Sequence, residues 1–446
     1  MTQYSPAPQN GVSVAPYDFI AIGIGPFNLG LACLTQPLKG VNALFIDQNT
    51  EFNWHPGMML ESAHLQTPFM ADLVTLADPT HPLSFLNYIK QQGRIYSFYI
   101  RENFFLMRKE YNQYCQWAAS RLNNLRFNTR AERIDFDAQQ QCYRVTCSDT
   151  RTGQPLHFLA RRLVLGTGPH PAIPDCCLAH AGRMTHAADY LSHKETLQTR
   201  RSITVVGSGQ SAAEIFYDLL GDIDEKGYQL NWLTRAPRFF PMEYTKLTLE
   251  MTSPEYVDYF HALPAAKRDE LNRLHQPLYK GINGSLINAI FDLLYIKRLN
   301  GELNVNMFTN TALVGVAPQA NGKALTLSLH QHEQDSRFTL NSEGVVLCTG
   351  YRHSIPAFLE GIRDRIVWDE QGRYDVARNY SIDHSRSGIF VQNVGPHTHS
   401  FVTPDLGMAC YRNAWLLREM TGTEHYPIEE RIAFQQFSAP PTGVVS

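Results

Sequence analysis

The sequence predicts an α/β protein with two Rossmann-like domains and a small helical insertion. Two stretches carry this prediction. Residues 19–22 form a short apolar run, followed by Gly23-x-Gly25 and a helical pattern. Residues 202–206 repeat this order, with Gly207-x-Gly209-x-x-Ala212 after them. Short apolar runs of this kind are typical of strands buried in parallel sheets, and each glycine turn then leads into a helix.

The first unit has the features of a dinucleotide-binding turn. Gly23 permits a tight turn, and Gly25 lets a pyrophosphate approach the helix N-terminus. Asn28 stands where a third glycine or alanine is usual. The next apolar run, residues 43–46, ends in Asp47, which is placed to accept a hydrogen bond from a ribose hydroxyl. A glycine turn also occurs in unrelated α/β proteins, but the strand before it and the acid after it favour a dinucleotide site.

The second unit differs in the residue that follows its second strand. Residues 230–235 end in Thr-Arg rather than in an acid, and a cation such as Arg235 suits the 2′-phosphate of NADPH. The alternative is an exposed salt-bridge residue. Two dinucleotide units in one chain indicate hydride transfer from a nicotinamide to a flavin. Because Asp47 suits a ribose with free hydroxyls, we expect FAD at the first unit and NADPH at the second.

The order of these patterns along the chain predicts an interleaved domain organisation. The Gly/Pro-rich turn after residue 165 suits a crossing between domains. Aromatic and charged residues with helical periodicity follow the second unit. We therefore expect an FAD-binding domain at 14–169 and 346–446, an NADPH-binding domain at 170–236 and 298–345, and a helical substrate-binding subdomain at 237–297.

Bulk properties exclude several classes of protein. The formal net charge of −3 over 446 residues predicts no binding to nucleic acid or to an anionic membrane. The eight cysteines contain no C-x-x-C pair, so neither a zinc site nor a disulfide reductase is expected, and no metal is expected elsewhere. The N-terminus lacks the pattern of a signal peptide, and no apolar run could span a bilayer. A reducing cytoplasm fits these observations.

Several motifs together resemble a known family, the flavin-dependent N-hydroxylating monooxygenases, which are the lysine and ornithine N-monooxygenases of hydroxamate siderophore biosynthesis. The resemblance covers nearly the whole chain. The matching stretches are Gly23-x-Gly25-Pro26-x-Asn28-Leu29, Trp54-His-Pro-Gly-Met58, Gln66-x-x-Phe69-x-x-Asp72-Leu-Val74, Pro79-Thr80, the segment Gly207-Ser-Gly-Gln-Ser-Ala-Ala-Glu214, Leu347-x-Thr349-Gly350-Tyr351 and His397-Thr-His399.

The resemblance implies a reaction. NADPH reduces FAD, oxygen adds at flavin C4a, and a neutral primary amine attacks the resulting hydroperoxide to become a hydroxylamine. An alkylamine with a pKa near 10.4 is only about 0.1% neutral at pH 7, or less, so the site must orient and deprotonate it. The resemblance also suggests a homo-oligomer, in particular a tetramer.

Roles for individual residues follow from the same resemblance. His55, Gln66 and Asn283 are expected to take part in the reaction, and His55 and Gln66 lie on the flavin side together with Trp54. Gln210 and Ser211 are expected beside the nicotinamide. Further cofactor contacts are expected from Pro26, Tyr351, Pro404 and Leu406, and substrate contacts from Ala71, Leu249, Asn283 and Gly407.

The chain departs from the family where the substrate's carboxylate is held. Ala71 replaces a lysine that contacts the α-carboxylate, and Leu249 replaces an asparagine. A carboxylate facing these side chains would be buried unpaired, at a cost of several kcal/mol. The departures favour a diamine such as cadaverine or putrescine, whose distal ammonium could pair with Glu250 or Asp72.

Two alternatives stay open at this point. L-Lysine or L-ornithine could be the substrate if another cation, such as Lys246 or Arg101, binds the carboxylate. A different class of function is a flavin redox carrier or sensor that hydroxylates nothing, although such a protein needs no amine pocket.

Overall fold

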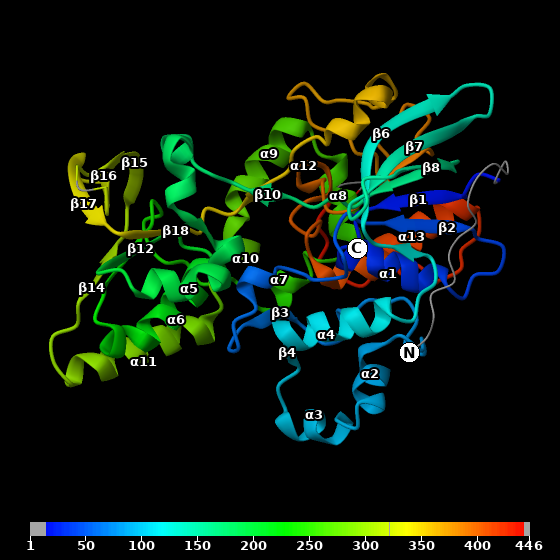
Figure 1. Cartoon of the computed structure of the whole chain (residues 1–446). Coiled ribbons are helices and arrows are strands. Elements are labelled where there is room, and N and C mark those ends of the chain that lie inside the picture. The colour runs from blue at the N-terminus through cyan, green and yellow to red at the C-terminus, as the bar shows by residue number, and fades with distance from the viewer. Residues whose placement is uncertain (1–14, 321, 441–446) are drawn as a thin grey trace.

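The computed structural model of the chain describes residues 15–320 and 322–440. Two five-stranded parallel sheets form separate parts of the molecule, one on each side of Figure 1. Both expected glycine turns join a strand of a parallel sheet to a helix, at β1–α1 and at β12–α6. The predicted pair of Rossmann-like units is therefore confirmed.

The first sheet has the strand order β20-β9-β1-β2-β5 and is parallel throughout. Its central strands are fully buried, as the unbroken apolar runs predict. Helices α1, α13 and α4 share a core with one face, and the antiparallel strands β6, β7 and β8 share a core with the other. The elements are β1 (Phe19–Ile22), α1 (Pro26–Thr35), β2 (Ala43–Ile46), α4 (Arg108–Ala119), β5 (Leu125–Arg126), β6 (Thr129–Asp137), β7 (Cys142–Asp149), β8 (Pro155–Ala160), β9 (Leu163–Leu165), β20 (Ile389–Val391) and α13 (Ala409–Thr421).

The second sheet has the order β11-β18-β12-β13-β14 and is also parallel. Helices α5, α6 and α11 pack on one face, and the antiparallel strands β15, β16 and β17 cover the other. The elements are β11 (Thr185–His186), α5 (Tyr190–Gln198), β12 (Ser202–Val206), α6 (Gln210–Lys226), β13 (Gln229–Leu233), α11 (Gly284–Leu299), β14 (Val305–Phe308), β15 (Thr311–Pro318), β16 (Leu325–Gln331), β17 (Ser336–Ser342) and β18 (Gly344–Leu347).

Two connections cross between the sheets, and they pair with each other. The short strands β10 (His170–Pro171) and β19 (Tyr351–Arg352) run antiparallel. The second crossing starts after β18, which belongs entirely to the second sheet. The boundary expected between residues 345 and 346 would cut this strand, so the crossing lies a few residues later, at the glycine turn before Tyr351.

The helical insertion is present, but it divides between the two parts. Its short helices share a core with the segment around Phe401 and Val402, next to the first sheet. Helix α11, in contrast, packs its apolar face on α6 of the second sheet. The helices of the first group are α8 (Pro254–Ala262), α9 (Ala265–Leu274) and α10 (Gln276–Lys280). Helices α8 and α9 contact α12 (Pro396–His399), and α10 contacts α9. The short helix α7 (Lys246–Leu249) precedes α8 in the chain.

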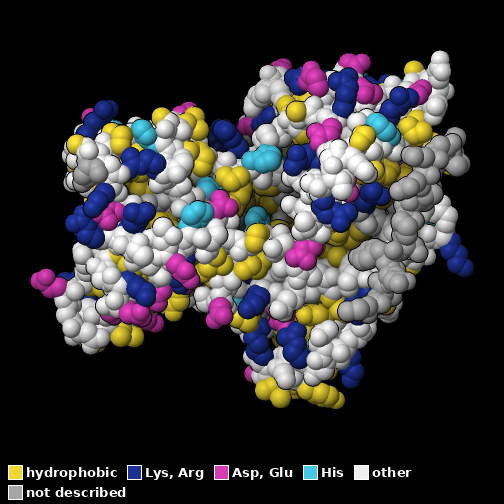
Figure 2. Space-filling view, in the orientation of Figure 1, with side chains coloured by type: hydrophobic (Ala, Val, Ile, Leu, Met, Phe, Trp, Pro, Cys, Tyr) yellow, Lys and Arg dark blue, Asp and Glu magenta, His cyan; other side chains and the backbone are white. Residues whose placement is uncertain are grey.

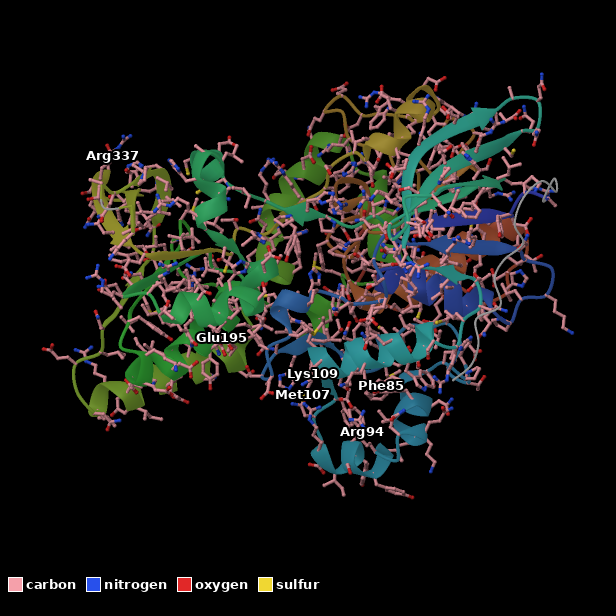
Figure 3. All side chains as sticks on the ribbon, viewed as in Figure 1. Phe85, Arg94, Met107, Lys109, Glu195 and Arg337 are labelled. Carbon is pink, nitrogen blue, oxygen red and sulfur yellow. The ribbon has the colours of Figure 1, made fainter. Side chains whose placement is uncertain are left out.

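A smaller outlying unit projects below α4 (Figure 3). Helix α2 (Phe85–Gln91) packs on α4 through aromatic rings, with the ring centroids of Phe85 and Tyr114 5.6 Å apart. Helix α3 (Ile95–Arg101) packs in turn on α2, with the ring centroids of Phe98 and Phe85 5.4 Å apart. An ion pair of 2.7 Å joins Arg94 to Glu110 at the start of α4. The strands β3 (His64–Pro68) and β4 (Phe105–Met107) lead the chain into this unit and out of it.

The remaining short elements are 3₁₀ turns, and they connect the larger ones. They are η1 (Pro56–Met58), η2 (Asp175–Arg183), η3 (Ala187–Asp189), η4 (Ala357–Arg365) and η5 (Leu406–Met408). Within the described ranges, none of the helices combines the length and apolar character needed to cross a bilayer.

Candidate functional site

A cavity of ≈ 1820 Å³ lies between the two sheets and receives residues from both glycine turns. Figure 2 shows the surface hollowed between the two parts, with histidine and hydrophobic side chains gathered at the hollow. Every residue expected to bind a cofactor lines this cavity. These residues are Gly23, Gly25, Pro26, Asn28, Asp47, Trp54, His55, Gln66, Gly207, Gly209, Gln210, Ser211, Arg235, Tyr351, Pro404 and Leu406.

The first glycine turn leaves room for an anion at the start of α1. Gly23 has φ of +90°, and a Cβ atom there would lie 2.4 Å from the Gly166 carbonyl oxygen. Gly25 is the N-cap residue of α1 and offers no side chain to the free backbone N–H groups of that helix. A Cβ atom on Gly25 would meet no other atom within 4 Å. The turn therefore fits a pyrophosphate group bound at a helix N-terminus.

The Asn28 side chain hydrogen-bonds to the backbone of this turn, a contact that the usual glycine at this position could not make. Its Nδ2 donates to the Gly23 carbonyl oxygen at 2.8 Å, and its Oδ1 accepts from Gln392 Nε2 at 3.2 Å. The side chain is only 1% exposed. Gly166 makes the space for it, since a Cβ atom at residue 166 would lie 2.3 Å from Asn28 Nδ2.

Asp47 is held in place at the end of β2. Its Oδ2 accepts from the Ile24 N–H at 2.6 Å, and its Oδ1 accepts from the Asn49 N–H at 2.8 Å. Each carboxylate oxygen has more than one acceptor site. The carboxylate can therefore still accept from a ribose hydroxyl in the cavity.

The second glycine turn has the same open helix N-terminus with cations nearby. Gly209 is the N-cap residue of α6 and again provides no capping side chain. Arg235 is exposed on the cavity wall and forms no ion pair with any residue that the structure describes. Burial lowers the pKa of the Lys280 ammonium, and the neighbouring Arg235 lowers it further. The salt-bridge alternative for Arg235 is thus not realised, and two cations are close together where a phosphate would be favourable.

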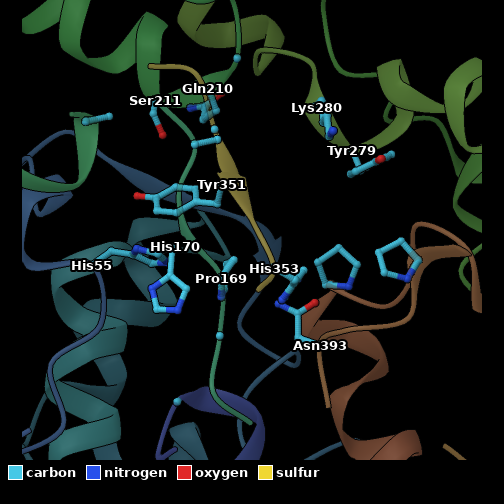
Figure 4. Close-up of a pocket in the computed structure, with 18 of the residues that line it drawn as sticks. His55, Pro169, His170, Gln210, Ser211, Tyr279, Lys280, Tyr351, His353 and Asn393 are labelled. Carbon is cyan, nitrogen blue, oxygen red and sulfur yellow. The ribbon is translucent and has the colours of Figure 1, made fainter. Parts of the chain in front are cut away.

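Aromatic rings from both parts meet beneath this turn (Figure 4). The His55 ring lies 5.0 Å from Trp54 and 5.7 Å from Tyr351, and Tyr351 lies 5.3 Å from His186. Burial lowers the pKa of the His55 imidazole to about 4, and the Arg108 guanidinium also contributes. His55 is therefore neutral at pH 7 and can accept or donate one hydrogen bond without carrying charge.

A chain of amide groups joins the two halves of the site. Gln66 Nε2 donates to Gln210 Oε1 at 3.4 Å, and the same oxygen accepts from the Asn283 N–H at 2.9 Å. Gln210 Nε2 in turn donates to Glu214 Oε1 at 2.9 Å. The Oδ1 of Asn283 caps helix α11 by accepting from the Ser285 N–H at 2.9 Å. Gln66, expected on the flavin side, and Gln210, expected beside the nicotinamide, thus belong to one hydrogen-bonded group with Asn283, which was expected to contact the substrate.

A smaller cavity of ≈ 590 Å³ adjoins this group of amides. Gln66 and Tyr244 line both cavities, and Asn283 lines only the smaller one. Among the described residues that line the smaller cavity, there is one carboxylate, that of Glu243, and no lysine or arginine. The side chains here therefore suit an ammonium or a neutral amine better than a carboxylate.

The predicted substrate contacts are only partly present. Leu249 lines the larger cavity, as expected. Ala71 lies in the hydrophobic core at 5% exposure and lines neither cavity, because its side chain is too short to extend from the core to the wall. Gly407 also lines neither cavity, and its N–H donates to Asp405 instead. Neither Ala71 nor Gly407 therefore lies on the wall of either cavity, and their substrate contacts stay predictions.

The carboxylates and cations suggested around the substrate have other roles. Asp72 is buried and accepts from the N–H groups of Val74, Thr75 and Phe85. Glu250 accepts from the N–H groups of Phe434 and Gln435 and so holds the C-terminal segment. Neither Lys246 nor Arg101 lines either of these two cavities, and Arg101 donates to the carbonyls of Asn103 and Phe105.

The sequence analysis missed three residues of the larger cavity, which are Glu243, Tyr244 and Asp405. Tyr244 and Glu243 belong to an irregular stretch before α7, and Asp405 precedes the expected Leu406. All three line the larger cavity. No local pattern distinguishes them, although the position of Asp405 between two expected cofactor contacts was a usable signal.

Comparison with known proteins is consistent with this geometry. A family model described as L-lysine 6-monooxygenase/L-ornithine 5-monooxygenase matches residues 15–353. The chain is 53% identical over 431 residues to the putrescine N-hydroxylase of Shewanella oneidensis, covering 97% of this chain and 86% of that protein. It is 52% identical over 429 residues to the alcaligin biosynthesis enzyme of Bordetella pertussis, covering 96% and 93%. The FAD-bound cadaverine monooxygenase of the desferrioxamine pathway from Erwinia amylovora superposes with a TM-score of 0.94 at 65% identity, covering 96% of this chain and 99% of that one.

Proposed function

Because this chain belongs to the L-lysine 6-monooxygenase/L-ornithine 5-monooxygenase family, we propose that it N-hydroxylates one terminal amine of a short diamine, cadaverine or putrescine. It is an NADPH-dependent flavin N-monooxygenase with FAD and NADPH as cofactors. Relatives that share half or more of its sequence are named for putrescine and cadaverine. We further propose that the hydroxylated diamine serves hydroxamate siderophore biosynthesis, in line with the alcaligin and desferrioxamine relatives.

The observation that carries the diamine assignment is the charge around the smaller cavity. Its lining includes the Glu243 carboxylate and, among the described residues, no cation that could pair with an amino-acid carboxylate. The two cations suggested for L-lysine or L-ornithine, Lys246 and Arg101, lie off both cavity walls. A buried carboxylate without a partner costs several kcal/mol, so an amino-acid substrate is disfavoured relative to a diamine.

The residues present fit both cofactors. The two open helix N-termini at Gly25 and Gly209 suit pyrophosphate groups, and Arg235 with Lys280 suits a 2′-phosphate. When bound, NADPH supplies a hydride and FAD supplies the means to activate oxygen. The chain's own task is to present a neutral amine, to orient it and to keep water away from the reacting atoms.

We assign the orienting role to the amide group of Gln66, Gln210 and Asn283. An amide can donate to an amine lone pair or accept from an amine N–H, and it carries no charge that would favour the protonated form. Oδ1 of Asn283 is used by the helix cap, so its Nδ2 is the atom free to turn towards substrate. His55 is neutral and close to Tyr351, so we assign it to the flavin side of the cavity.

The proposal extends to domains, assembly and location. We propose that the first sheet binds FAD, the second binds NADPH and the helical insertion contributes to the substrate cavity. We also propose a homo-oligomer, in the form of a tetramer, because α3 exposes Tyr96 at 77%, Tyr99 at 71% and Ile100 at 74%. A cytoplasmic location is proposed because NADPH is the reductant and the eight cysteines are free, which fits a reducing compartment.

The test is product formation with each amine in turn. Enzyme with FAD, NADPH and oxygen is given cadaverine, putrescine, L-lysine or L-ornithine, and hydroxylamine is measured. NADPH consumption alone is insufficient, since reduced flavin also loses electrons to oxygen without hydroxylating substrate. Efficient hydroxylation of either diamine supports the proposal, whereas faster hydroxylation of L-lysine or L-ornithine contradicts it. Flavin turnover with no hydroxylamine from any amine would support a redox carrier or sensor.

A further inference from the structure

We propose that Asp405 is the residue that recognises the distal ammonium of the diamine and thereby selects diamines over simple alkylamines. This inference rests on the proposed function and deepens it, because the two amino groups of a diamine need different treatment. The reacting amine must be neutral, while the distant one stays protonated at neutral pH. A site that uses diamines therefore benefits from one fixed negative charge away from the reacting end.

Asp405 is on the wall of the larger cavity, in the turn between Pro404 and Leu406, which line the same wall. It is partly buried, and its Oδ1 accepts from the Gly407 N–H at 2.8 Å, which fixes the direction of the carboxylate. The described residues donate to its Oδ1 and not to its Oδ2. One carboxylate oxygen is therefore anchored, and the other is available to a ligand in the cavity.

The surroundings place this carboxylate near the substrate end. Tyr244 lines both cavities. Its burial raises the pKa of its hydroxyl, and the negative charge of Asp405 raises this pKa further. The Tyr244 ring also contacts Phe105, which lines the smaller cavity, with centroids 6.0 Å apart. Asp405 is thus close to Tyr244, one of the residues that the two cavities share.

Asp405 forms no ion pair with any residue that the structure describes. Arg412 is the cation whose charge acts on it, although the two side chains form no ion pair. Arg412 donates instead to Gln392 Oε1 and to the Thr403 carbonyl, each at 2.9 Å. Burial raises the pKa of the Asp405 carboxyl, with the Gly407 N–H and Arg412 opposing this shift. An ammonium placed beside the free oxygen would stabilise the charged carboxylate and would itself gain a partner.

Glu243 is the competing carboxylate, and its setting is less favourable. It lines both cavities but is exposed, so solvent and salt weaken its attraction for a cation. Asp405 is partly buried, where the same charge acts through a lower effective dielectric. Glu243 therefore provides a matched control with the same charge, on the same cavity, at a more exposed position.

The experiment compares a diamine with a monoamine of the same length. Cadaverine and n-pentylamine present the same reacting end, but only cadaverine carries a distal ammonium. We expect Asp405→Asn, which retains an oxygen for the Gly407 N–H, to lower the ratio of kcat/KM for cadaverine to that for n-pentylamine by about tenfold or more. The change should be mainly in KM for cadaverine, and Asp405→Ser should behave in the same way.

Other results would overturn the inference. If Asp405→Asn lowers kcat/KM for both amines equally, Asp405 serves only the local structure. If Glu243→Gln lowers the ratio of the two kcat/KM values as much or more, Glu243 binds the ammonium. Binding of the two amines to the FAD-loaded protein, measured by calorimetry, makes the same comparison without turnover. Tighter binding of cadaverine that Asp405→Asn abolishes would support the inference even if hydroxylation failed, and equal binding of both amines by the unmodified protein would refute it.

Discussion

Arg108 of α4 and Glu214 of α6 form a two-point ion pair between the two parts of the molecule. Two guanidinium nitrogens of Arg108 donate to the two carboxylate oxygens of Glu214, each at 3.1 Å. The side chains are only 13% and 4% exposed. Glu214 also accepts from Gln210 Nε2, so the pair connects the domain contact directly to the amide group of the site.

Removing one charge of this pair should destabilise the protein. Glu214→Gln leaves Arg108 buried without its partner, and we expect the free energy of unfolding to fall by about 3 kcal/mol. Because Gln210 loses an acceptor of full charge, KM for NADPH should rise as well. Urea unfolding and steady-state kinetics measure the two effects.

The double variant Arg108→Met/Glu214→Leu tests whether the loss of stability comes from the unpaired charge that Glu214→Gln leaves on Arg108. It removes both partners, so no charge is left unpaired, and most of the lost stability should return. If the double variant is less stable than Glu214→Gln, the pair contributes through packing and not through its charges.

Gly25→Ala should separate flavin binding from folding. Its added methyl group meets no protein atom within 4 Å, so stability should be unchanged. It would, however, occupy the space where a pyrophosphate approaches α1, and we expect the Kd for FAD to rise about tenfold or more. Gly182→Ala, at a glycine with equally open surroundings away from the cavity, is the matched control. Unchanged FAD affinity in Gly25→Ala would place the pyrophosphate elsewhere.

Arg235→Ala should reduce the preference for NADPH over NADH. A hydrogen bond from a charged donor contributes about 1.5–3 kcal/mol, so the ratio of the two kcat/KM values should fall about tenfold or more. Lys280 remains nearby, so some preference should persist. Arg238→Ala removes a nearby cation that is not on the cavity wall and stacks on Phe240, and it should leave the ratio intact. A full preference in Arg235→Ala would assign the phosphate to another cation.

His55 should make stability depend on pH below neutrality. Its pKa is lowered to about 4 in the folded protein from an ordinary value of 6.5. Between these values the unfolded chain binds more protons, so stability is fully present above pH 6.5 and is lost as the pH falls towards 4. Across this pH range we expect the free energy of unfolding of His55→Asn to fall by about 2 kcal/mol less than that of the unmodified protein. This value is smaller than the full pKa difference would give, because the imidazole is partly exposed to the cavity. Asparagine suits the left-handed backbone at this position, where φ is +51°.

The measurement is denaturant unfolding at a series of pH values, with the exposed His157 replaced by asparagine as a control. The control should retain the pH dependence of the unmodified protein. A His55→Asn variant with that same dependence would show that other buried histidines, such as His399, are responsible.

The sequence by itself determined the two nucleotide-binding units and the chemistry of the family. Each unit depends on residues close together in the chain: a buried strand, a glycine with positive φ, a helix start and an acid or cation after the next strand. Such features act through local backbone geometry, so they could be predicted from the sequence without knowledge of tertiary contacts. The replacement of the family lysine by Ala71 also favoured a diamine, in line with the relatives named for putrescine and cadaverine.

Only the tertiary structure decided which side chains meet in the cavity. Asn28 and Gln392 hydrogen-bond across 364 positions of the chain, and Gln66 and Gln210 across 144. Asp72 and Glu250 were reasonable partners for an ammonium until their oxygens were found bonded to backbone N–H groups. The availability of Asp405 has the same origin, because whether a carboxylate is free depends on every segment that packs around it, and no local pattern records those contacts.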